Sequence, residues 1–187
     1  MAITKHEWWA TPVWEIETGL SESFNLKLDA EINSLVVDKD QPFNIWNYKK
    51  PCLMELKELI IKHVIEISEG LFTNNYMFNP HPSRGWVNRQ RTGEGMVLHD
   101  HGNSLMAVTY YIKAPLGSGD LLLVDPRHSA RWDIQKENNI VGIRYKRITP
   151  TPSKLVIFPA YLLHMVEINK SRDVRVSLST NISNGTI

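Results

Sequence analysis

The sequence predicts an α+β fold, in which two amphipathic helices precede a β-rich half that fits a jelly roll or cupin. The N-terminal part contains two segments with apolar residues at helical spacing. From about Gly85 onward, short runs of β-branched and aromatic residues alternate with Gly, Pro, Asn and Asp. Helices followed by about seven or eight short strands are the order expected of such a fold.

Length and composition limit the kind of protein. The 187 residues suit a single domain, 1–187, with a strand and helical support in 1–84 and the β core in 85–182. A net charge of +1 without a basic block gives no reason to expect nucleic acid as a partner. The sequence contains no apolar run of the roughly 18 residues that a membrane span needs. We therefore expect no membrane association, and a homodimer is compatible with this composition.

The single cysteine, Cys52, has no partner within the chain for a disulfide, and the first residues lack the pattern of a secretory signal. Both observations predict a cytoplasmic setting. Cys52 also has no histidine at motif spacing, so we do not assign it as a nucleophile.

Two helices are expected before the strands. The first begins at Ser21 or Ser23, either of which is a good N-cap, and continues to the polar stop at 38–40. After a loop at 40–50, Pro51 opens the second helix, which ends at Gly70. The apolar stripes are Leu26, Leu28, Ile32, Leu35 and Val36 in the first helix, and Leu53, Leu56, Ile60, Val64 and Ile67 in the second.

One strand is expected ahead of the helices and seven after them. The segment 126–150 is too long and polar for a tight connection, so we expect a flexible lid or substrate loop there. The expected strands are Trp8–Ile16, Trp86–Gln90, Met96–His99, Leu105–Ile112, Asp120–Val124, Lys154–Phe158, His164–Ile168 and Asp173–Thr180.

The sharpest local feature is the triplet His99-Asp100-His101 at the end of an expected strand. Residues two apart on a strand point to the same face, roughly 6.6 Å apart, so both imidazoles can approach one metal ion while Asp100 points away. Taken alone, the triplet is weak evidence for a metal site, because solvated histidines at a polar strand end give the same pattern. The other histidines (His6, His63, His81 and His128) fall in expected loops or beside a helical stripe, and we assign none of them to a metal.

A second polar group follows at His164, Arg175 and Ser177. If 169–172 form a hairpin turn, residue 164 pairs with 177, and all three side chains share one face. An inward arginine beside an inward histidine favours an anion, because its planar fork binds a carboxylate through two parallel hydrogen bonds. Taken alone, the arginine is better explained by an acidic partner, aspartate or glutamate, at the core edge.

The combined pattern resembles the iron(II)- and 2-oxoglutarate-dependent oxygenases. The family pattern is H-x-(D/E/H), then after a long gap a histidine, followed by ten intervening residues and R-x-S. In this sequence the first triplet is His99 to His101, the later histidine is His164, and R-x-S is Arg175 to Ser177. Residues 86–181 are also similar to a bacterial and phage subfamily with an H-x-H motif. The resemblance implies a double-stranded β-helix core and an iron(II) ion held by His99, His101 and His164.

The same resemblance implies four contacts to 2-oxoglutarate, from Arg175, Ser177, Tyr111 and Asn88. Tyr111 lies in a Tyr-Tyr-Ile strand similar to the Tyr-Tyr-Leu strand of the family, and Asn88 precedes His99 by eleven residues. The implied activity uses O2 and 2-oxoglutarate to hydroxylate an unidentified small molecule or peptide, with release of succinate and CO2.

One departure from the family pattern concerns the second ligand. Most members have a carboxylate where this sequence has His101, and three neutral ligands change the charge and reactivity of the metal. Asp100 entering through a β-bulge is an alternative. Two other functions stay open at this point: a three-histidine cupin dioxygenase that does not use 2-oxoglutarate, and a non-catalytic jelly-roll binding protein.

Overall fold

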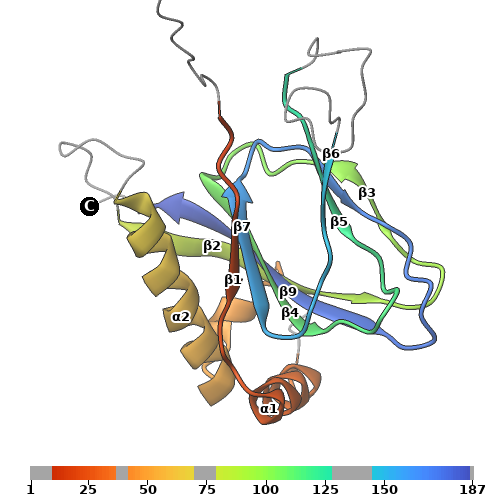
Figure 1. The fold of residues 1–187 in the computed structure, drawn as a ribbon. Coiled ribbons are helices and arrows are strands. Elements are labelled where there is room, and N and C mark those ends of the chain that lie inside the picture. Colours follow the sequence, from red (N-terminus) through yellow and green to blue (C-terminus); the bar gives the residue numbers. More distant parts are fainter. Residues whose placement is uncertain (1–9, 37–41, 70–78, 128–144, 186–187) are drawn as a thin grey trace, which may run out of the picture.

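The structure, a computed structural model, describes residues 10–36, 42–69, 79–127 and 145–185 (Figure 1). Its strands form two sheets in which all neighbours are antiparallel. The five-stranded sheet contains, in spatial order, β1 (Trp14–Glu17), β7 (Lys154–Pro159), β4 (Met106–Lys113), β9 (Arg175–Asn184) and β2 (Pro80–Gln90). The four-stranded sheet contains β3 (Met96–His99), β8 (His164–Val166), β5 (Leu121–Val124) and β6 (Tyr145–Ile148).

Alternation along β4 divides the five-stranded sheet into two faces. Tyr111 packs with Leu121 and Leu123 of the four-stranded sheet, which forms the core between the sheets. Tyr110 points the other way and belongs to the core beneath the helices, where its hydroxyl donates to Asn25 Oδ1 at 2.7 Å. The sheets therefore face each other across one interior and form an antiparallel jelly roll, as predicted.

The helices cover the outer face of the five-stranded sheet, as the sequence predicts (Figure 1). They are α1 (Glu22–Asn33) and α2 (Pro51–Ser68), joined through a short 3-10 helix, η1 (Ile45–Asn47), within the expected loop at 40–50. Ser21 is the N-cap of α1, and its Oγ accepts from Phe24 N. The α1 helix ends earlier than expected, and Leu26 and Val36 are exposed by 58% and 87%, so both were wrongly placed in the buried stripe.

A carboxylate from α1 caps the start of α2. Lys50, the N-cap residue of α2, makes no side-chain capping bond. Instead, the two carboxylate oxygens of Glu31 accept from the backbone N–H groups of Cys52 and Leu53 at 3.1 and 3.2 Å. A negative charge at a helix N-terminus also interacts favourably with the helix dipole. The two helices are therefore joined by an electrostatic contact as well as by apolar packing.

We expect Glu31→Ala to lower the free energy of unfolding by about 1–2 kcal/mol, because it removes both acceptors from the first turn of α2. Urea denaturation followed by circular dichroism would measure this difference. Glu58→Ala is the matched control, since Glu58 is an exposed residue of α2 whose carboxylate forms no hydrogen bond or ion pair with a described residue. Equal losses in the two variants would contradict the capping role.

Several strand bounds differ from those expected. The first strand is shorter, because β1 starts at Trp14, and β2 starts earlier, at Pro80. Residues 145–148, expected in the lid, form β6 and pair with β5. Most of that expected lid, 128–144, lies outside the described residues.

The expected hairpin between β8 and β9 is wrong. His164 in β8 pairs with His99 and Leu123, whereas Arg175 and Ser177 in β9 pair with Gln90 and Asn88 of β2. The chain crosses from one sheet to the other between β8 and β9. His164 and Arg175 still face the same interior, because the inner faces of the two sheets oppose each other.

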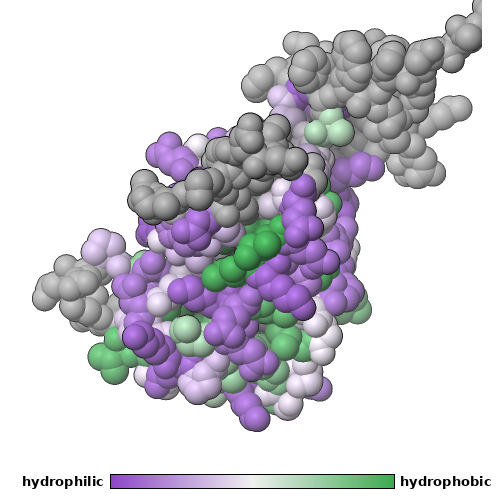
Figure 2. All heavy atoms as spheres, turned by 90° about the vertical axis from the view of Figure 1, so that its left-hand side faces the viewer, coloured by the Kyte–Doolittle hydropathy of each residue, from purple (hydrophilic) through white to green (hydrophobic). Residues whose placement is uncertain are grey.

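The side of the molecule shown in Figure 2 is mainly hydrophilic, with a hydrophobic strip near its centre and smaller hydrophobic areas towards its lower part. The hydrophilic surface is expected because α2 turns its mainly apolar face to the sheet. The buried residues of α2 are Cys52, Leu53, Leu56, Ile60, Val64 and Ser68. Neither helix in the described part of the chain has the length and apolarity to cross a bilayer.

Candidate metal centre

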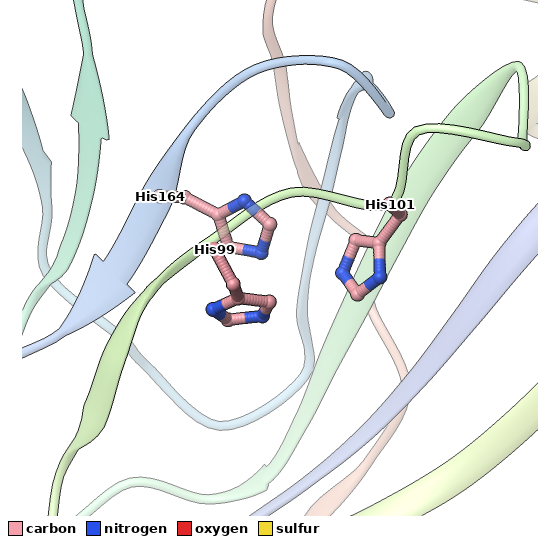
Figure 3. Close-up of side chains that lie close together, drawn as sticks. All are labelled: His99, His101 and His164. Carbon is pink, nitrogen blue, oxygen red and sulfur yellow. The ribbon is translucent and has the colours of Figure 1, made fainter.

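Three histidine side chains converge between the two sheets (Figure 3). His99 ends β3, His164 opens β8 as its direct cross-strand partner, and His101 follows two residues after β3. One ring nitrogen from each lies within 4.8 Å of the others. Among the described residues, this is the one group of histidine, cysteine or acidic side chains whose ligand atoms come this close together.

Two of these imidazoles are oriented by the backbone. Nδ1 of His99 lies 2.7 Å from Val97 O, and Nδ1 of His164 lies 2.8 Å from Leu162 O. A carbonyl can only accept, so each Nδ1 carries the proton and each Nε2 keeps a free lone pair. This arrangement is typical of metal-binding histidines, whose second nitrogen donates to a carbonyl or a carboxylate.

His101 is held through its backbone, whose N–H donates to Ala160 O at 2.8 Å, in the connection that follows β7. Its ring centroid lies 5.5 Å from that of Trp86 on β2. The loop after β3 is therefore fixed against the five-stranded sheet, and this places the third imidazole beside the other two.

Burial favours the neutral form of the His101 and His164 imidazoles. It lowers the pKa of His164 to about 4, and the neighbouring His99 and His101 act in the same direction. Burial, with His99, also lowers the pKa of His101. Only the neutral imidazole can bind a metal, so His101 and His164 need lose no proton on binding near neutral pH. The donor set therefore fits a first-row transition-metal ion.

Asp100 does not join the group. Its Oδ1 accepts from Gly102 N at 3.0 Å in an exposed turn. The β3–β8 ladder does have an irregularity between Met96 and His99, but Asp100 lies beyond it, is exposed, and is not part of the histidine cluster. The structure thus gives no support to the alternative in which Asp100 is the second ligand.

A cationic group lies on the opposing sheet, in the same cavity. Arg175 is 2% exposed, and its Nη1 donates to Gln90 Oε1 at 2.6 Å. Its guanidinium carbon lies 5.0 Å from the ring centroid of Tyr111, and no described carboxylate forms an ion pair with it. The expected alternative, an arginine paired with an acidic residue at the core edge, is therefore wrong for the described residues.

Three buried donors around Arg175 have no acceptor among the described residues: Arg175 Nε, Gln90 Nε2 and the Tyr111 hydroxyl. An unmade hydrogen bond of this kind costs about 1–3 kcal/mol, so three in one place need an explanation. Burial raises the pKa of Tyr111 although Arg175 opposes this effect, so the phenol remains a donor at neutral pH. Positive charge and three free donors fit a carboxylate.

Asn88 and Ser177 extend this polar surface towards the histidines. Ser177 is the cross-strand partner of both Asn88 and Tyr111. The Asn88 amide donates to Ser179 Oγ at 3.1 Å. All seven residues singled out from the sequence line one cavity. The volume of this cavity is about 40 Å³.

Sequence reasoning missed two residues of this cavity, Gln90 and Trp86. Both lie on the expected strand 86–90, two residues to either side of Asn88, and alternation alone would have placed them on the same face. His63, which we did not assign to a metal from the sequence, lies on α2 with its Nδ1 3.4 Å from Glu66 Oε2.

Facing antiparallel sheets with a histidine cluster between them define a jelly-roll protein with a candidate metal centre. A family model described as "Putative 2OG-Fe(II) oxygenase" matches residues 84–181, just over half of the chain. The chain belongs to this family, and it is an iron(II)- and 2-oxoglutarate-dependent oxygenase that consumes O2. No curated protein matches the sequence significantly.

Solved structures of similar fold include a prolyl-4-hydroxylase from Pseudomonas putida. It is 15% identical, with a TM-score of 0.61 over 94% of this chain and 89% of that one. HygX from Streptomyces hygroscopicus, with nickel and 2-oxoglutarate bound, is 9% identical, with a TM-score of 0.66 over 95% and 84%. SnoN, a non-heme epimerase from nogalamycin biosynthesis, is 11% identical, with a TM-score of 0.66 over 94% and 77%. At these identities the likeness concerns the fold.

Proposed function

We propose that His99, His101 and His164 hold the iron(II) ion of this oxygenase, in a single domain whose two sheets form a double-stranded β-helix. The observation that carries this is the convergence of three imidazoles, two of which donate Nδ1–H to backbone carbonyls. This fixes the free Nε2 lone pairs before any metal arrives. The reorganisation that metal binding requires is correspondingly small.

The second part of the proposal concerns 2-oxoglutarate. The three unpaired donors around Arg175 suit the carboxylate remote from the metal, with Ser177 and Asn88 lining the path back towards the histidines. In HygX, nickel and 2-oxoglutarate are bound together within a similar fold. We propose the same co-substrate position for Arg175, Ser177, Tyr111 and Asn88.

The proposed reaction is hydroxylation of a small molecule or peptide. Iron(II), 2-oxoglutarate and O2, when bound, supply an oxidation that inserts oxygen into a C–H bond and releases succinate and CO2. The chain contributes orientation and the exclusion of water. His99, His101 and His164 would direct lone pairs at the metal, while Arg175 and Tyr111 would fix one end of the co-substrate in the cavity between the sheets.

The proposal is tested by incubating the chain, loaded anaerobically with iron(II), with 2-oxoglutarate and O2, and measuring succinate. We expect iron-dependent succinate formation by the wild-type chain and by Asp100→Ala, because Asp100 only caps an exposed turn. His99→Ala should form none above the metal-free baseline. Loss of iron and turnover in Asp100→Ala, with retention in His99→Ala, would contradict the proposed ligand set.

A further inference from the structure

The inner face of β9 carries a polar row that continues past the histidines. Arg175, Ser177 and Ser179 line the cavity on alternate positions, and Asn181 is the next residue on the same face. Asn181 Oδ1 is buried and has no hydrogen-bond partner among the described residues. The proposed iron and co-substrate sites do not use it, so this acceptor requires a donor from elsewhere.

The cross-strand partner of Asn181 is Arg84 on β2. A Cβ at Gly85 would lie 2.4 Å from Trp46 Nε1, so position 85 faces η1 and the helices. Arg84 and Trp86, on either side of it, therefore face the interior between the sheets. Arg84 is exposed, and its guanidinium has no ion pair or side-chain hydrogen bond with any described residue.

Arg84 lies at one end of a row of cross-strand partners that runs across the five-stranded sheet from a residue in contact with His164. Phe158, Ala107, Asn181 and Arg84 are successive cross-strand partners on β7, β4, β9 and β2. At one end of this row the Phe158 ring lies 4.8 Å from that of His164. At the other end, the carbonyl of Arg84 accepts from Thr180 Oγ1 at 2.8 Å, which holds this part of β2 in place.

The two inward arginines thus lie on opposite sides of the histidine cluster. Arg175 is six residues from Asn181 along β9, or about 20 Å, while Trp86, which contacts His101, is about 7 Å from Arg84 along β2. Arg175 is buried at the closed side, and Arg84 is exposed where a ligand can arrive from solvent.

We propose that Arg84 and Asn181 bind the substrate, and that the substrate is an anionic small molecule; this rests on the proposed function. Its carboxylate or phosphate accepts hydrogen bonds from the Arg84 guanidinium, and an adjacent O–H or N–H donates to Asn181 Oδ1. Amino acids and sugar phosphates both carry this combination of groups. Arg84 lies only about 7 Å along β2 from Trp86, which contacts His101. A small molecule is therefore long enough to place its anion at Arg84 and its reacting carbon beside the histidines.

The test measures binding, so it does not depend on turnover. The chain, loaded anaerobically with iron(II) and 2-oxoglutarate, is titrated in a calorimeter with each common L-amino acid and with a panel of sugar phosphates. Amino acid amides and unphosphorylated sugars are the uncharged counterparts. The variants are Arg84→Gln and Arg91→Gln, which remove the same charge; Arg91 lies just beyond β2 and lines a groove on the outer side of the sheet, beside α1.

We expect a member of one anionic panel to bind the wild-type chain and Arg91→Gln equally well, and Arg84→Gln about ten- to a hundredfold more weakly. The panel that contains this member identifies the anion as carboxylate or phosphate. The proposal is overturned if no member of either panel binds, if uncharged counterparts bind equally well, or if Arg84→Gln binds like Arg91→Gln. Absence of succinate from the wild-type chain would instead refute the proposed function and leave the binding result standing.

Discussion

His164→Ala is expected to reduce the affinity for iron(II) by more than about 100-fold. Loss of a group that only orients a metal ligand costs 10- to 100-fold, and removal of a ligand should cost at least as much. His164 is the most buried of the three imidazoles, 5% exposed, and its Nδ1 is bonded to Leu162 O. Anaerobic titration with iron(II), together with metal analysis of the loaded protein, measures the effect.

Two comparisons separate this effect from a loss of fold. His63→Ala removes a histidine of α2 outside the cluster and should leave metal binding unchanged. His164→Gln keeps most of the side-chain volume beside Phe158 and should lose iron while it retains the wild-type circular dichroism spectrum. If a folded His164→Gln variant bound iron like the wild-type chain, the three-histidine centre would be wrong.

Arg175→Ala should weaken 2-oxoglutarate binding by about 100-fold or more while the chain still binds iron(II). The substitution removes the buried positive charge and a planar fork that can form two charge-assisted hydrogen bonds, each worth about 1.5–3 kcal/mol. The measurement is the dissociation constant for 2-oxoglutarate, determined anaerobically on iron-loaded protein, beside the iron content of the same samples.

Arg175→Lys tests the geometry of this contact, because it keeps the charge but loses the fork, and we expect an affinity between those of the wild type and Arg175→Ala. Arg89→Ala is the control on the outer face, where Arg89 donates to Asp29 Oδ1 at 2.8 Å. Unchanged 2-oxoglutarate affinity in Arg175→Ala would mean that the buried guanidinium serves another anion.

Local patterns in the sequence predicted much of the fold. Helical spacing and Pro51 identified α2 from its first residue, and Ser21 was correctly expected as a cap. Alternation was enough to place Arg175 and Ser177 on one face, and the same face does line the cavity. These features depend on neighbours in the sequence, which is why a single sequence reveals them.

Pairing between strands could not be predicted in the same way. A gap of ten residues between His164 and Arg175 is compatible with a hairpin in one sheet and with a crossing between two sheets, and the second is observed. The choice depends on how β3 and β5 pack beside β8, which are contacts distant in sequence. Gln90 lies on the face that alternation predicts, but its hydrogen bond with Arg175 depends on the pairing of β2 with β9. The role proposed for Arg84 depends on the same pairing, through Asn181. The expected cytoplasmic setting and homodimer stay predictions.

The absence of Asp100 from the histidine cluster affects which metal the chain will contain when it is isolated. A pocket with imidazole donors alone follows the Irving–Williams order, in which nickel, copper and zinc all bind more tightly than ferrous ions. Occupancy by iron therefore depends on which metal ions are supplied rather than on selectivity of the pocket. Protein purified in air is expected to carry zinc or nickel, and activity should return only after chelation and reconstitution under nitrogen.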